Sequence, residues 1–231
     1  MPQLTQAVLN GQVGLLSSRQ FLAGRGNAFI VNNPTFGTAV AYALKTAWSA
    51  TANGLFVIQN KNAPGGANIY IDSITLKQTA TAPATTVSLN LDIWSEIGFV
   101  TATSAVATIT PVPLANGQGY SSTTGALVQA FSAGAATIPA AVGARTAQQQ
   151  VSIPTGVTIL GDVFEFDFGS DGPSAGTNGL TAARAATPAR MTAQGEPIVV
   201  VPGTTTIINA WWTGAATNIP SFEYAMPYFE L

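Results

Sequence analysis

Apolar and polar residues alternate along most of this chain with the period of a β-strand. The clearest case is TTVSLNLDIWSE (85–96), in which the aliphatic side chains from Val87 to Ile93 fall on one face and the polar ones from Ser88 to Asp92 on the other. Successive side chains of a strand point to opposite faces of a sheet. The alternation therefore predicts a half-buried antiparallel strand.

The same pattern predicts further strands, separated by turns rich in Pro, Gly and Asn. They are NAFIVNN (27–33), GTAVAYALKTAW (37–48), GLFVIQN (54–60), NIYIDSITLKQ (68–78), VATITPV (106–112), ALVQAFS (126–132), QQQVSI (148–153), DVFEFDFG (162–169), PIVVV (197–201), TTTIINAWW (204–212) and SFEYAMPYFEL (221–231). In the last strand the alternate residues Phe222, Tyr224, Met226 and Tyr228 are expected to face the core. No long amphipathic helix competes with these strands. We therefore predict an all-β fold, an antiparallel β-sandwich or jelly roll.

Two segments do not fit the strand pattern and set the predicted domain organisation. Residues 1–25 form an N-terminal arm, in which Leu4 and Val8 recur at helical spacing before glycines break the pattern, so a short helix and an irregular lead-in are expected. Residues 26–231 form a single sandwich domain. Residues 170–196 read as one long polar loop, and loops of this length are usually functional or mobile.

A pair of adjacent tryptophans, Trp211 and Trp212, follows a β-branched run that predicts a strand. The two indoles must face opposite ways. By alternation with Ile208 and Ala210, we expect Trp212 inside and Trp211 outside. The outer indole is then covered by a neighbouring subunit, covered by the arm or long loop of the same chain, or left open as a sugar-stacking platform. The residues predicted to make subunit contacts are Trp211, Trp212, Arg184, Arg190, Leu4 and Val8.

Charge and composition narrow the possible functions. Charged residues make up only 8% of the 231 residues, and the eight Lys and Arg residues are scattered, so no basic stripe for nucleic acid is present. The chain has no Cys and no His, which excludes disulfides, thiolate metal sites and His-dependent catalytic sites built from this chain alone.

No apolar run is long enough for a transmembrane helix. The first residues, MPQLTQAVLN, lack the features of a secretory signal peptide, so synthesis in the cytoplasm is expected.

One cluster of acidic residues could carry chemistry. The stretch DVFEFDFGSDG contains Asp162, Glu165, Asp167 and Asp171. Glu165 and Asp167 share one strand face, so this cluster is a weak candidate for a calcium site or for a carboxylate pair of a glycoside hydrolase. The favoured interpretation is the polar side of an amphipathic strand. We accordingly expect no metal, no cofactor and no enzymatic activity.

The order of several segments resembles that of bacteriophage virion structural proteins, in particular jelly-roll capsid decoration or cement proteins. The segments are LFVIQN, NIYIDSITL, VSLNLDIW, IVVVPGTTTIINAWW and SFEYAMPYFEL, within residues 53–95 and 197–231. The resemblance implies a non-enzymatic component of the virion. It also implies a homotrimer or another symmetric oligomer, bound to virion proteins such as the major capsid protein. The alternative is a carbohydrate-binding module or adhesin that uses surface aromatics.

Overall fold

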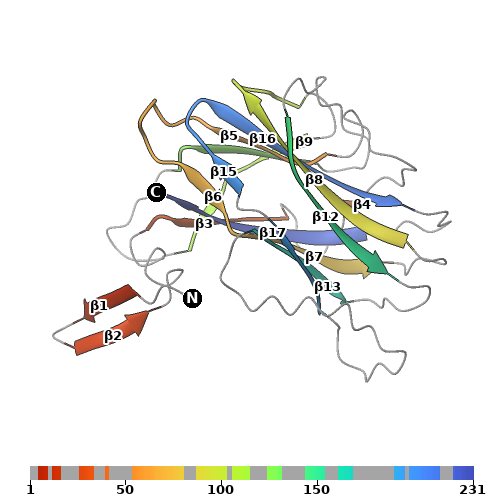
Figure 1. Ribbon diagram of the computed structural model, residues 1–231, viewed down its shortest axis with the longest axis horizontal. Coiled ribbons are helices and arrows are strands. Elements are labelled where there is room, and N and C mark those ends of the chain that lie inside the picture. Colours follow the sequence, from red (N-terminus) through yellow and green to blue (C-terminus); the bar gives the residue numbers. More distant parts are fainter. Residues whose placement is uncertain are drawn as a thin grey trace.

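The computed structural model describes residues 5–9, 12–16, 26–33, 40–41, 54–80, 87–102, 106–114, 124–131, 144–153, 161–168, 190–195, 198–213 and 221–231. Over these residues the secondary structure is entirely β, and two larger sheets pack against each other (Figure 1). The prediction of an all-β sandwich is confirmed. Jelly-roll connectivity stays a prediction.

The nine-stranded sheet is built around β17 (Ser221–Glu230) and β7 (Ser73–Ala80). Its main order is β10-β3-β17-β7-β13-β14, with β4 and β6 also pairing with β17, and β15 with β6. The bounds of the other strands are β3 (Ala28–Asn32), β4 (Val40–Ala41), β6 (Ile69–Ile71), β10 (Val112–Pro113), β13 (Val163–Phe168), β14 (Arg190–Gly195) and β15 (Ile198–Val200). The pairing of β13 with β14 is parallel.

The six-stranded sheet has β16 (Thr204–Thr213) and β8 (Val87–Ile97) near its centre. Its order is β12-β8-β16-β5-β11-β9, and its pairings are antiparallel. The remaining strands are β5 (Gly54–Asn60), β9 (Val106–Ile109), β11 (Ala126–Phe131) and β12 (Ala144–Ile153).

The core between the sheets is formed by the alternate apolar residues that the sequence pattern singles out. Phe222, Tyr224, Met226 and Tyr228 of β17 all lie in it, as do the three phenylalanines of β13. The ring of Phe56 on β5 meets that of Tyr224 edge-to-face, with centroids 4.9 Å apart, so this pair joins the two sheets. Edge-to-face aromatic pairs stabilise a core beyond their buried area.

The segment 68–78 differs from the single strand that we predict. It forms two strands, β6 and β7, that break at Asp72. Ile69 and Ile71 are buried in the core, and so are Ile74 and Leu76, so the inward-facing positions change from odd to even numbers across the break. The Asp72 N–H donates to the carbonyl of Pro227 on β17 at 3.1 Å. A proline inside a paired strand is typical of such an irregular position, because it has no N–H to donate.

The N-terminal segment also corrects the expectation. Instead of a helix, residues Thr5–Leu9 (β1) and Gln12–Leu16 (β2) form a separate antiparallel two-stranded sheet, in which Leu9 pairs with Gln12. The two residues between them in the sequence are Asn10 and Gly11. Asn-Gly between two strands is the preferred sequence of a two-residue hairpin connection, and this signal outweighs the helical spacing of Leu4 and Val8.

The predicted loop 170–196 ends earlier than expected, because residues Arg190–Gly195 form strand β14. The strand is recruited by pairing with β13 along its whole length, from Val163 with Arg190 to Phe168 with Gly195. Of the predicted strand 37–48, the structure describes β4 alone.

Candidate functional site

The outer face of the six-stranded sheet, which points away from the core between the sheets, carries polar side chains that are nonetheless buried. Asp92 and Thr205 are fully buried, and Asn90, Gln59 and Asn209 are at most 2% exposed. The expectation that β8 is half-buried is therefore wrong. Its aliphatic face packs in the core, and its polar face is covered as well. Buried polar groups are costly unless they are hydrogen-bonded, so this face requires specific partners.

Trp211 lies on this outer face, as predicted, but it is not exposed. Only 5% of its side chain is accessible within the single chain. Its indole Nε1 donates to Oδ2 of Asp92 at 2.7 Å, across from the neighbouring strand (β8) of the sheet. Within the single chain little of the indole is left for a neighbouring subunit to bury, and the part of Trp211 in subunit contacts stays a prediction.

The segment Gly98–Ala102 is held by side chains from three strands of the six-stranded sheet. Gln59 Nε2 donates to the carbonyl of Val100 at 2.7 Å, and the Val100 N–H donates to Oγ1 of Thr205 at 3.0 Å. The Thr205 hydroxyl in turn donates to the carbonyl of Gly98 at 2.7 Å. At the far end of the segment, the Ala102 N–H donates to Oε1 of Gln129 at 3.1 Å. These bonds pair the Gln59 and Gln129 amides and the Thr205 hydroxyl with the segment and fix it in place.

Large apolar side chains are exposed where this segment meets the turn before β16. Ile97 is 98% exposed, Phe99 is 55% exposed and Val201 is 45% exposed. We call these three residues the apolar end. Their two backbone segments are joined by a hydrogen bond of 3.0 Å from the Gly98 N–H to the carbonyl of Gly203. Both glycines have positive φ, 90° and 83°, a conformation that residues with a Cβ rarely adopt.

The charge at the apolar end is small. The Lys61 ammonium lies 5.2 Å from the centroid of the Phe99 ring, which is within the range of a cation–π contact. The ring therefore offers one face to the lysine and keeps more than half of its surface accessible. Sequence patterning does not find this site, because an apolar residue next to a glycine turn reads equally well as core.

The structure describes three of the four residues of the acidic cluster, and on β13 it gives the cross-strand neighbours of two of them. Glu165 pairs in register with Thr75 of β7 and with Thr192 of β14, and Asp167 pairs with Ser73 and Gln194. Their cross-strand neighbours are thus hydroxyl and amide residues rather than further carboxylates. Throughout the part of the chain that the structure describes, no group of three or more acidic side chains is placed to hold a metal ion. Asp162 is fully buried, and Asp171 lies outside the described residues.

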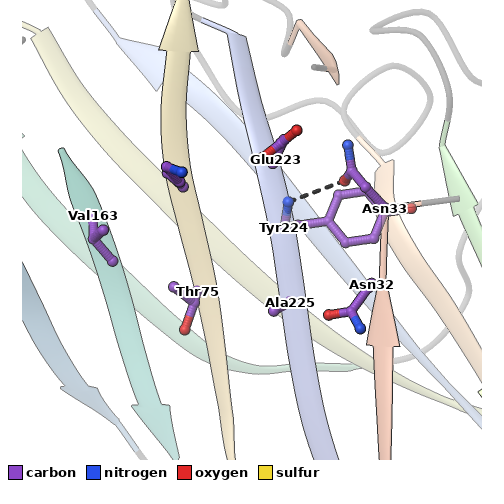
Figure 2. A pocket seen from close by; sticks show the side chains of 8 residues that line it. Asn32, Asn33, Thr75, Val163, Glu223, Tyr224 and Ala225 are labelled. Atoms are coloured by element: carbon purple, nitrogen blue, oxygen red, sulfur yellow. Dashed lines mark hydrogen bonds between the residues drawn. The ribbon is translucent and has the colours of Figure 1, made fainter. Parts of the chain in front are cut away.

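A pocket lies on the outer face of the nine-stranded sheet (Figure 2), and it has a volume of about 640 Å³. It is lined by Asn32, Asn33, Thr75, Lys77, Val163, Glu223, Tyr224 and Ala225. At its rim, Asn33 Oδ1 accepts the backbone N–H of Tyr224 at 3.0 Å, and the Asn33 N–H donates to the Tyr224 carbonyl at 3.3 Å. Burial raises the pKa of the Tyr224 phenol above its usual 10.0.

The remaining predicted contact residues lie outside what the structure describes. Leu4 and Arg184 fall in segments without described placement. For Val8 in β1, Arg190 in β14 and Trp212 in β16, the strand is described but the side chain is not. Their roles in subunit contacts stay predictions. Near the C-terminus, Tyr224 is 4% exposed and Tyr228 is fully buried, so neither offers an open ring to a sugar.

No family model, curated protein or solved structure matches this chain. Among the described residues, no helix is long and apolar enough to cross a membrane.

Proposed function

We propose that this chain is a non-enzymatic structural protein of a bacteriophage virion, a capsid decoration or other capsid-associated protein that stabilises the particle through subunit contacts. The observation that carries the proposal is the apolar end. Three large apolar side chains are exposed there on a β-sandwich, on turns that hydrogen bonds hold in place. Exposed apolar groups gathered in this way are typical of protein–protein contact surfaces.

The rigidity of this end favours contact with another protein. Gln59 and Thr205 anchor the segment that carries Phe99, and the bond between Gly98 and Gly203 fixes its distance from Val201. A surface whose backbone is already ordered loses little conformational entropy when it binds. Most of the free energy from burying Ile97 and Phe99 would then remain available for association.

The low charge of the chain suits the same role. With 8% charged residues, subunit contacts must consist mainly of apolar and neutral hydrogen-bonding groups. Salt screens interactions between exposed charges and leaves apolar contacts intact. We therefore expect the assembly of this chain to persist in about 1 M salt, where the screening length is about 3 Å.

Light scattering coupled to size-exclusion chromatography tests the proposal. We expect the purified chain to form a trimer or another closed oligomer, and Ile97→Asp and Phe99→Ser to shift it to monomer without loss of circular dichroism. Val112→Asp is the matched control, because Val112 is 52% exposed on a different strand, β10. A wild-type chain that stays monomeric at micromolar concentration, or a control that dissociates as readily as the apolar-end variants, would contradict self-assembly through this end.

A further inference from the structure

We infer that the pocket on the outer face of the nine-stranded sheet binds a neutral saccharide unit. This inference goes beyond the proposed structural role and uses different residues. The volume of about 640 Å³ falls within the range of small-molecule sites, about 300–1,000 Å³. It also differs from the sugar-stacking platform considered above, because it uses hydrogen-bonding side chains on a sheet face.

The floor of the pocket consists of two neighbouring cross-strand rows. In the first row, Lys77 of β7 lies between Val163 of β13 and Glu223 of β17. In the second row, Thr75 pairs with Ala225, which pairs with Asn32 of β3. With strands about 4.8 Å apart, the floor from β13 to β3 spans about 14 Å. Figure 2 shows the labelled members of the two rows, which are Val163, Glu223, Thr75, Ala225 and Asn32, on neighbouring strands of one sheet.

Several of these polar side chains have hydrogen-bonding capacity left. Within the described part of the chain, the side chains of Asn32, Thr75 and Lys77 take part in no hydrogen bond or ion pair. An amide, a hydroxyl and an ammonium together offer both donors and acceptors. A sugar hydroxyl is itself a donor and an acceptor, so it can use all three kinds of group.

The charge balance of the pocket selects a neutral ligand. Lys77 and Glu223 face each other in register and contribute opposite formal charges that sum to zero. An anionic ligand attracted to Lys77 would be repelled by the nearby Glu223 carboxylate, and a cationic ligand attracted to Glu223 would be repelled by Lys77. A neutral ligand is repelled by neither side chain. The small apolar side chains of Val163 and Ala225 give the carbon-bound hydrogens of a sugar ring a surface to contact.

The rim of the pocket is held in place before any ligand arrives. Asn33 makes a two-point contact with the backbone of Tyr224, accepting its N–H and donating to its carbonyl. This contact continues the pairing of β3 with β17 beyond Asn32, which pairs with Ala225. A preorganised site loses less conformational entropy on binding.

Saturation-transfer NMR and calorimetry on the full chain test the inference. The probes are neutral oligosaccharides of glucose, galactose and N-acetylglucosamine, with sialic acid and free amino acids as charged and zwitterionic probes. We expect at least one neutral saccharide to bind at millimolar concentration or tighter. Asn32→Ala and Thr75→Val should each weaken it about three- to tenfold, as expected for one lost hydrogen bond. Thr108→Val is the matched control, because Thr108 is an exposed strand residue of the other sheet, and it should leave binding unchanged.

Folding of each variant is checked by its thermal midpoint, since Asn32 and Thr75 make no side-chain hydrogen bond among the described residues and their replacement should leave the fold intact. Binding by no neutral saccharide in the panel, binding by the charged or zwitterionic probes alone, or equal binding by wild type and both pocket variants would each overturn the inference. The oligomeric state is read from the same samples. A wild-type chain that forms the intact oligomer but binds no neutral saccharide therefore refutes this inference and leaves the proposed structural role untouched.

Discussion

Replacement of Trp211 by phenylalanine should destabilise the isolated chain. The indole is 5% exposed, and its Nε1 donates to the fully buried Asp92 at 2.7 Å. Phenylalanine keeps most of the aromatic ring but cannot donate to the carboxylate. The substitution therefore tests whether this hydrogen bond holds the outer face of the six-stranded sheet together.

The expected magnitude follows from two contributions. Removing one partner of a buried hydrogen bond costs about 1–3 kcal/mol, because the other partner is left unsatisfied. The smaller ring also leaves part of the indole volume empty, and large-to-small substitutions in a packed site carry an added cavity cost. Together these predict a loss of about 2–4 kcal/mol in the free energy of unfolding for Trp211→Phe. Trp211→Ala should cost more, about 3–5 kcal/mol.

Urea unfolding followed by far-ultraviolet circular dichroism measures this loss, and a double-mutant cycle isolates the bond. In the Asp92→Ala background the acceptor is missing, so Trp211→Phe should cost about 1 kcal/mol less than in the wild-type background. Val112→Ser is the control, because Val112 is 52% exposed and lies outside the apolar end, and it should change stability by no more than about 0.5 kcal/mol.

Two results would refute this reasoning. One is a Trp211→Phe variant as stable as the control, with no coupling to Asp92. The other is a destabilisation that disappears when the protein is diluted to monomer, because the indole would then be covered by a neighbouring subunit rather than by its own chain.

Two further predictions concern turns and buried tyrosines. Gly125→Ala should cost about 0.5–1.5 kcal/mol, because an added Cβ would displace the side-chain amide of Asn62 from its hydrogen bond of 2.9 Å to the Ala67 carbonyl. Urea unfolding should show a smaller cost in the Asn62→Ala background, and equal costs would contradict this displacement. Burial raises the pKa of Tyr228 above its usual 10.0, and a neighbouring Glu230 adds to the effect. The stability contributed by this neutral phenol is therefore fully present below about pH 10 and is lost as the pH rises toward its raised folded pKa. Between about pH 9 and about pH 11, the urea midpoint of Tyr228→Phe should fall less steeply with rising pH than the midpoint of the wild-type chain. Parallel plots of midpoint against pH would show that this phenol does not contribute to the pH dependence of stability.

Several features of the fold can be predicted from the sequence, because a strand buried on one side has apolar residues at every second position. The alternation of Phe222, Tyr224, Met226 and Tyr228 correctly identifies the core face of β17, and the three phenylalanines of β13 do the same. The connection between Leu9 and Gln12 was also predictable, since Asn-Gly is a local hairpin signal. The helical spacing of two apolar residues was too short a pattern to outweigh it.

Other features depend on partners that are distant in sequence. The break at Asp72 is set against Pro227, and β14 takes its place by pairing with β13. The apolar end was not predicted, because exposure of Ile97 and Phe99 follows from how two turns are held together rather than from their own sequence. The pocket likewise brings together single residues from four strands.

The sequence by itself determined the all-β class, the faces of the principal strands and the direction in which Trp211 points, because these depend on local alternation. Only the tertiary structure decided what those faces meet. The polar face of β8 reads as solvent-exposed, yet Asp92 is buried there beneath a tryptophan on the neighbouring strand. Gln59 is buried likewise against a segment about 40 residues away. Alternation shows that the two faces of a strand differ in polarity. Burial of the polar face depends on hydrogen bonds with residues distant in the sequence, and a local pattern cannot predict these partners.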